Sequence, residues 1–183
     1  LSDVAGNHPF LFACISNRLE NVKYWLNRFS DWDLESPNRL FGETPLSIAI
    51  YMGANRLELV KVLIKAGANV HAVTDNGGSI LGSVCSSEDG DPNVADFLIH
   101  RGADVNYRVK DRTFKWKAIR FSTRVLVRLN LAKSGLVHFL ATESGTTALN
   151  HAVLRGNIEV VELLLSMGAD PRVKNDLGQD AAA

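Results

Sequence analysis

Apolar residues in this chain recur in pairs of short stretches with helical spacing, separated by polar turns. Between Gly145 and Gly178, apolar positions over 148–153 form the first stretch, Gly156 interrupts the pattern, and a second stretch runs over 158–165. A Gly-Ala-Asp turn at 168–170 ends the second stretch. This pattern predicts two short helices and a turn. Helices this short cannot bury their apolar faces alone, so they require copies of the same unit on either side.

Copies of this unit occur at regular intervals along the chain. The turn at 168–170 is repeated as Gly-Ala-Asn at 67–69 and Gly-Ala-Asp at 102–104. The first glycines of these turns are Gly67, Gly102 and Gly168, so they lie one and then two periods of about 33 residues apart. A period of about 33 residues that combines a turn with two helices is typical of one class of stacked repeat.

Two segments carry a family resemblance, namely TPLSIA at 44–49 and NIEVVELLLSMGAD at 157–170. On these residues the chain resembles the ankyrin repeat family over nearly its whole length. The resemblance implies an all-α solenoid of stacked helix-turn-helix units with β-turn finger loops. We expect a single array over residues 1–183, with repeats at about 7–41, 42–76, 77–111, 112–144 and 145–177. Partial repeats are expected at both ends, in a segment of a longer protein.

Residues 112–144 fit the pattern least well, yet their glycines keep the period. Gly135 lies midway between Gly102 and Gly168, and Gly145 follows Gly135 at the same interval at which Gly77 follows Gly67. This register predicts a degenerate fourth repeat. Arg128 and Asn130 fall where the next copy has apolar residues. A distorted second helix and a differently folded segment therefore remain alternatives.

The same region is strongly basic within a chain of zero net charge. Nine Lys or Arg residues and a single acid, Asp111, lie between Arg108 and Lys133, interleaved with Phe114, Trp116 and Phe121. Cations with aromatic residues suit an acidic or phosphorylated protein partner. Single-stranded nucleic acid or lipid head groups are the minor alternatives. The competing interpretation is a solvated face with Trp116 in the core.

Motifs of catalytic or cofactor chemistry are absent from the sequence. The five histidines lack zinc-ligand spacing, and no P-loop, G-x-G-x-x-G or G-x-S-x-G segment occurs. We therefore expect no enzyme activity, no cofactor and no metal. His151 occupies an apolar helix position, which predicts a hydrogen-bonded core histidine. Cys14 and Cys85 are expected to be buried reduced thiols, and no apolar run reaches membrane-spanning length, which together favour a cytoplasmic or nuclear location.

The expected function is recognition of a protein partner. The family resemblance implies a concave surface made by finger tips and by residues late in each first helix. The positions expected to contact the partner are Phe41, Tyr51, Met52, Lys110, Arg112, Arg120, Phe121, Leu154 and Arg155. A protein–protein interaction scaffold is the favoured function. A regulatory or targeting segment of a larger enzyme or channel is the alternative. Trp32, in a long finger loop, is expected to fold back onto the helices.

Overall fold

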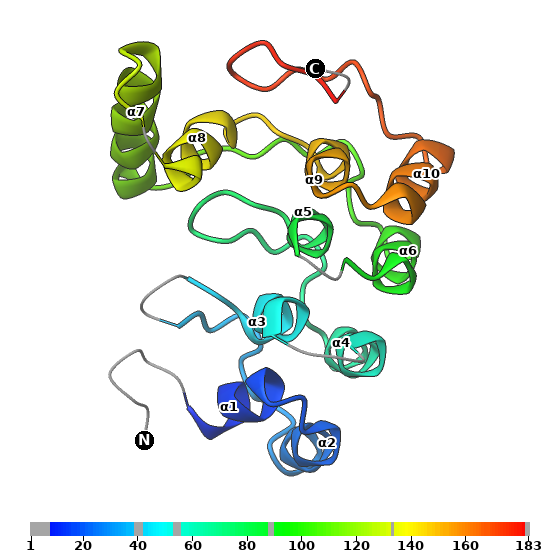
Figure 1. Ribbon diagram of the computed structural model, residues 1–183. Coiled ribbons are helices and arrows are strands. Elements are labelled where there is room, and N and C mark those ends of the chain that lie inside the picture. The colour runs from blue at the N-terminus through cyan, green and yellow to red at the C-terminus, as the bar shows by residue number, and fades with distance from the viewer. Residues whose placement is uncertain (1–7, 39–41, 53–55, 88–89, 133, 182–183) are drawn as a thin grey trace.

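Paired helices stacked in two columns form the fold of this protein (Figure 1). The computed structural model describes residues 8–38, 42–52, 56–87, 90–132 and 134–181. Within these residues the helices are α1 (Pro9–Ile15), α2 (Leu19–Arg28), α3 (Pro45–Met52), α4 (Arg56–Lys65), α5 (Ile80–Ser86), α6 (Pro92–His100), α7 (Phe114–Arg128), α8 (Gly135–Thr142), α9 (Ala148–Arg155) and α10 (Ile158–Ser166). The described residues contain no extended sheet, and their β-pairing is limited to an isolated bridge between Val73 and Ser79.

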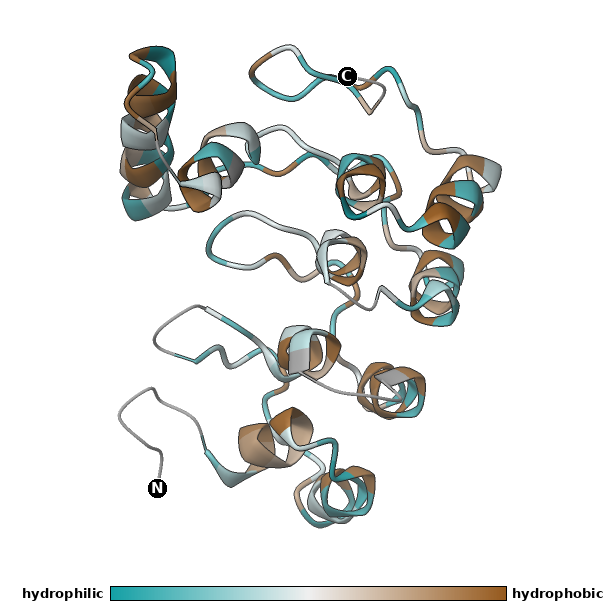
Figure 2. Cartoon of the chain, in the orientation of Figure 1, coloured by the Kyte–Doolittle hydropathy of each residue, from teal (hydrophilic) through white to brown (hydrophobic). Residues whose placement is uncertain are grey.

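The inner column is formed by α1, α3, α5 and α9, which contact one another in that order. The outer column is formed by α2, α4, α6 and α10, and each outer helix also packs against the inner helix that precedes it in the chain. Hydrophobic residues of both columns lie between successive layers (Figure 2), where Leu46, Leu81 and Leu149 are almost fully buried. The expected all-α ankyrin-type solenoid is thus confirmed.

Local sequence signals define the ends of these helices. Thr147 caps α9 in a capping box with Asn150, and Gly156 ends the helix with a left-handed φ of 69°. Ser79 and Asp91 cap α5 and α6 through their side-chain oxygens. These signals act within a few residues, which explains why the sequence pattern places these helices well.

Finger loops project from the inner column on one side. In one finger Thr74 N–H donates to the Gly78 carbonyl at 3.0 Å, and in the last finger Asn175 N–H donates to the Gln179 carbonyl at 2.8 Å. Two tip residues, 75–76 and 176–177, lie inside each of these turns, just before Gly77 and Gly178. Both glycines have positive φ, as this turn requires.

The third finger has the same base but carries a large insertion. Val109 N–H donates to the Thr146 carbonyl at 2.9 Å, and Gly145 N–H donates to the Val109 carbonyl at 2.9 Å. Val109 therefore corresponds to Thr74 and Asn175. The segment 110–144 stands where the other fingers have two tip residues, so the insertion adds about 33 residues, the length of one ankyrin repeat. The interval from Gly145 to Gly178 has the same length.

The predicted fourth stacked repeat at 112–144 is therefore wrong for this structure. α7 and α8 pack against each other as a hairpin beside the fingers, while α9 packs directly on α5 and α10 on α6 (Figure 1). Gly67, Gly102 and Gly168 end their helices at positive φ, whereas Gly135 is the first residue of α8 and is not among the positive-φ glycines. The glycine register persists because the insertion has the length of one repeat.

Candidate protein-binding groove

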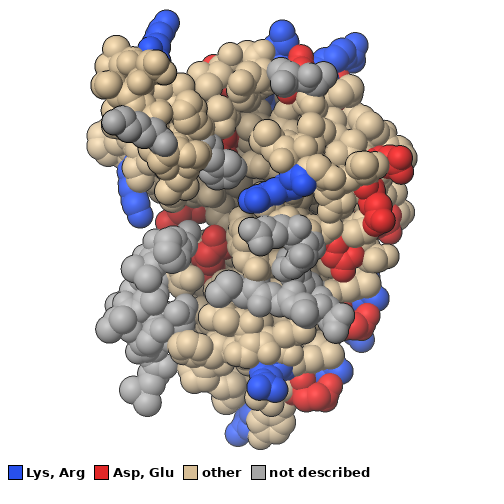
Figure 3. Space-filling model, in the orientation of Figure 1, with Lys and Arg blue, Asp and Glu red and all other residues tan. Residues whose placement is uncertain are grey.

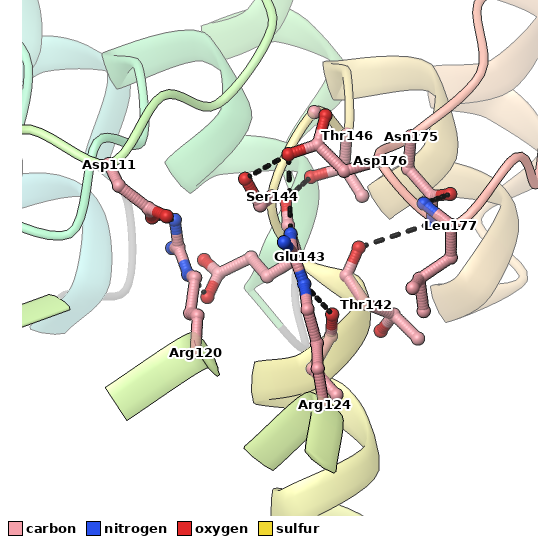
Figure 4. A network of polar contacts seen from close by, with 12 residues as sticks. Asp111, Arg120, Arg124, Thr142, Glu143, Ser144, Thr146, Asn175, Asp176 and Leu177 are labelled. Atoms are coloured by element: carbon pink, nitrogen blue, oxygen red, sulfur yellow. Dashed lines mark hydrogen bonds and ion pairs between the residues drawn. The ribbon is translucent and has the colours of Figure 1, made fainter. Parts of the chain in front are cut away.

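A buried arginine attaches the α7–α8 hairpin to the array. Arg120 of α7 is fully buried and forms ion pairs with Asp111 and with Glu143, the latter at 3.1 Å (Figure 4). It also donates to the Asn76 carbonyl at 2.7 Å. Burial raises the pKa of the Glu143 carboxyl, and the charge of Arg120 opposes that shift. Removing one member of such a group would leave buried charge uncompensated. Arg120 therefore holds α7 against the preceding finger.

A second polar contact joins the hairpin to the last finger. Asp176 accepts from Ser144 Oγ at 2.6 Å and from Arg124 at 3.2 Å, and Arg108 lies 3.4 Å from its other oxygen (Figure 4). The hydrogen bond from Ser144 is the largest cause that lowers the pKa of Asp176, followed by contributions from Arg124 and Arg108. Arg124 also donates to the Ala141 carbonyl of α8 at 3.3 Å. The hairpin is therefore bonded to the fingers on both sides of it.

These contacts change the interpretation of the basic stretch. Arg108, Arg120 and Arg124 bind carboxylates or carbonyls of the chain itself. Arg120 was predicted to contact a partner, and that prediction is corrected, because its side chain has no exposed surface in this structure. Lys110, Lys115, Lys117 and Arg128 are exposed, and Arg112 is exposed although it also donates to the Val73 carbonyl at 3.3 Å. About half of the predicted basic surface thus remains for a partner.

A pocket of about 600 Å³ lies between α8 and the inner helix α9. Its lining combines exposed apolar side chains, Leu136 and Leu154, with the cation of Arg155 and with His138. One wall comes from the insertion and the other from the repeat array. The hairpin therefore turns the open face of α9 into a lined recess.

The predicted contact residues are distributed over several parts of the structure. Leu154 and Arg155 line the α8–α9 pocket, while Phe121 lies on α7 and is 70% exposed. Tyr51 lies on α3, and Lys110 and Arg112 lie at the base of the insertion. Phe41 and the side chain of Met52 lie outside the described part of the structure. Glu143 and Asp176, which position the hairpin, were missed as functional residues, although both fall at finger tips.

Tyr51 lies near acidic and hydroxyl groups of the neighbouring layers. Burial raises the pKa of the Tyr51 hydroxyl, hydrogen bonds with Ser83 and Ser86 partly oppose the shift, and the charges of Glu43 and Glu143 add to it. The residue is nevertheless 40% exposed. Tyr51 therefore presents an aromatic surface beside a polar strip of α5.

Several buried side chains agree with the sequence analysis. His151 is buried and lies 3.3 Å from Thr146 Oγ1 through Nε2, as a hydrogen-bonded core histidine should. Burial lowers the pKa of His151 to about 4, so the ring is neutral at physiological pH. Trp32 folds back onto the helices, with ring contacts to Phe10 and Trp25. Cys14 and Cys85 are buried free thiols.

The sequence comparisons identify the family. The description "Ankyrin repeats (3 copies)" matches residues 10–109, and "Ankyrin repeat" matches residues 144–176. The first match alone covers more than half of the chain, so the protein belongs to the ankyrin repeat family. The two matches leave out residues 110–143, which contain the inserted hairpin. Ankyrin repeats generally mediate protein–protein interaction, and they are typically non-catalytic.

Curated relatives come from several kinds of protein. The chain is 28% identical to "Ankyrin repeat and KH domain-containing protein mask-1" of Caenorhabditis elegans, over 94% of this chain and 8% of that protein. It is 30% identical to human "Palmitoyltransferase ZDHHC17", over 93% of this chain and 26% of that protein. It is 32% identical to human "Protein phosphatase 1 regulatory subunit 27", over 51% of this chain and 67% of that protein. The chain thus spans only a small part of the first two of these relatives.

Over the part of the chain that the structure describes, none of the helices combines the length and the apolar character needed to cross a membrane. The same residues hold no cluster of three or more His, Cys, Asp or Glu side chains that could bind a metal ion.

Proposed function

We propose that this chain is a protein-binding module whose partner occupies the face of the inner helices beside the α7–α8 hairpin. The observation that carries the proposal is the α8–α9 pocket, where Leu136 and Leu154 are exposed next to Arg155. Arginine is enriched in protein interfaces, and burial of exposed leucine side chains by a partner would be favourable. The expected ligand is a peptide segment with a large apolar side chain beside an acidic one.

Tyr51 extends this surface along the inner column. It lies two inner helices away from α9, across α5, whose Ser86 is partly exposed. A peptide that follows the inner column would meet an aromatic ring, a hydroxyl strip and then the apolar pocket. This order of chemistries favours an extended segment over a compact domain surface.

The test is selection of peptides from a random display library on the immobilised chain. Enriched peptides are expected to pair Asp or Glu with a large apolar residue, and to lose about tenfold in affinity with Leu154→Ser. Ile158→Ser is the matched control, because Ile158 on α10 is as exposed as Leu154. Tyr51→Ala is compared in the same way with Tyr24→Ala on α2. If affinity is equal across each pair, the proposed surface is not the binding site.

A second candidate follows from the names of the relatives. One is a palmitoyltransferase and another a phosphatase regulatory subunit, and the chain matches only 26% of the former. We propose as the alternative that the array serves as the regulatory or targeting segment of a longer enzyme. Sequencing of the full transcript tests this alternative directly, since it predicts a catalytic domain in the same polypeptide.

A further inference from the structure

The outer face of α7 carries an apolar stripe that the fold does not cover. Phe114, Phe121 and the C-cap residue Leu129 are 85%, 70% and 61% exposed, and Ala118 and Val125 between them are also exposed. At about 100° per residue, these five positions fall within roughly 80° of the helix circumference. Residues on the opposite face, such as Arg120 and Thr123, are buried. α7 is therefore apolar on a face that points away from the repeats.

The spacing along this stripe is that of a helix seam. Phe114, Ala118, Phe121 and Val125 are separated by four, three and four residues, as a and d positions of a heptad are. A stripe this narrow is typical of helix–helix contact, whereas helices that lie in a membrane surface have a broader apolar face. The helix is 15 residues long, or about 22 Å, which offers two full heptads to a partner.

Cations border the stripe on both edges. Lys117 precedes an a position and Lys115 follows a d position, which places them at the two edges that carry charge pairs between helices. Arg124 also precedes an a position, but it is already paired with Asp176. α7 contains five Lys or Arg residues and no acid. The hairpin occupies the upper left lobe of Figure 3, where Lys or Arg side chains lie at the upper and lower ends of the lobe.

We propose that the outer face of α7 is a docking surface for an acidic amphipathic helix of a partner protein. Charge complementarity selects this occupant. A second copy of this chain would place like charges of two α7 helices together, which is unfavourable. The surface is separate from the α8–α9 pocket, since Phe114 and Phe121 do not line that pocket. The two binding activities can therefore be lost independently.

The probes are two monomeric three-heptad peptides with leucine at the a and d positions. One has Glu at the e and g positions and the other has Lys there, and binding to the full chain is measured by fluorescence anisotropy. The Glu peptide is expected to bind at least about tenfold more tightly than the Lys peptide, with affinity that falls as salt rises. Equal affinities, or no binding of the Glu peptide, would overturn the proposal.

Surface variants locate the binding. Phe121→Ser and the double reversal Lys115→Glu with Lys117→Glu are each expected to weaken binding of the Glu peptide by about tenfold, whereas Ile158→Ser on α10 leaves it unchanged. All four residues are exposed, and circular dichroism checks that each variant stays folded. Phosphatidylserine vesicles serve as the competing surface. Vesicle binding that depends on Phe121, without peptide binding, would overturn the proposal in favour of a membrane.

Discussion

Asn106 and Asp170 meet across a layer of the stack although 64 residues separate them. The Asp170 N–H donates to the Asn106 side-chain oxygen at 2.8 Å. In the same way, the Asn69 N–H donates to the Glu35 side-chain oxygen at 2.8 Å, but only 34 residues separate these two. Glu35 and Asn106 occupy corresponding places, because the N–H of each donates to the acidic residue two positions earlier. The last repeat therefore stacks on the third as the second stacks on the first.

Replacing Arg120 by Leu should detach the hairpin. The change leaves Asp111 and Glu143 without their counter-charge, which costs about 3–5 kcal/mol for a buried pair. Because repeats contact only their neighbours, amide hydrogen exchange should speed up in α7 and α8 while α1 to α4 keep their protection. Arg128→Leu, at a solvent-accessible position of the same helix, is the control and should cost less than about 1 kcal/mol. Equal protection of α7 in both variants would contradict the role of Arg120.

Gly77 and Gly168 should respond differently to alanine. Both have positive φ, 88° and 87°, so each substitution costs about 1–2 kcal/mol of backbone strain. At Gly77 the new Cβ would collide with the Lys110 carbonyl oxygen, whereas at Gly168 nothing lies within 4 Å. Urea unfolding should therefore show Gly77→Ala to be clearly the more destabilising change. Similar free energies for the two variants would mean that the fingers do not stack this closely.

His151 should make the protein sensitive to acid. Its pKa is about 4 when folded and about 6.5 in an unfolded chain, so the unfolded state binds more protons between these values. The neutral ring makes its full contribution to the free energy of unfolding above pH 6.5, and this contribution is lost as the pH falls from 6.5 toward 4. From pH 6.5 to 5 this loss is about 1.6 kcal/mol. Urea unfolding at the two pH values should show a smaller decrease in the free energy of unfolding for His151→Gln than for the wild type. An identical decrease in both proteins would contradict a buried neutral His151.

The two thiols should react only after unfolding. Burial raises the pKa of both Cys14 and Cys85 to about 12, so neither forms much thiolate at neutral pH. Ellman's reagent at pH 8 should find almost no reactive thiol in the folded protein and two in guanidinium chloride. Rapid reaction of the folded protein would show that α1 or α5 opens readily.

The sequence predicts the regular layers well because their signals are local. Caps such as Thr147, helix-ending glycines such as Gly156, and apolar spacing in α9 and α10 specify both helices without reference to distant residues. The insertion was misplaced because it has the length of one repeat and so preserves the glycine period. One sequence signal does distinguish it, since the helical pattern of α7 continues for 15 residues, through the point where a repeat would need its inter-helix turn.

The polar contacts of the hairpin could not be predicted in the same way. Arg120 looks like a surface cation in the sequence, and its partners Asn76 and Glu143 lie far from it along the chain, one on each side. They come together only when the third finger closes at Val109 and Thr146. Leu154 and Arg155 were predictable as exposed positions late in a first helix. The pocket that these two residues line could not be predicted from the sequence, because its second wall is α8.

The most direct test of the central claim, that the hairpin lies outside a continuous stack, compares two spin-labelled pairs. One pair joins Glu35 and His71, and the other joins Asn106 and Arg172. All four residues have solvent-accessible surface, and they occupy corresponding positions in their repeats. Cysteine substitution and electron paramagnetic resonance should give similar distances for both pairs, one layer of about 10 Å. If residues 112–144 formed an intervening repeat, the second distance would be larger by about another 10 Å, and a hairpin outside the stack would be ruled out.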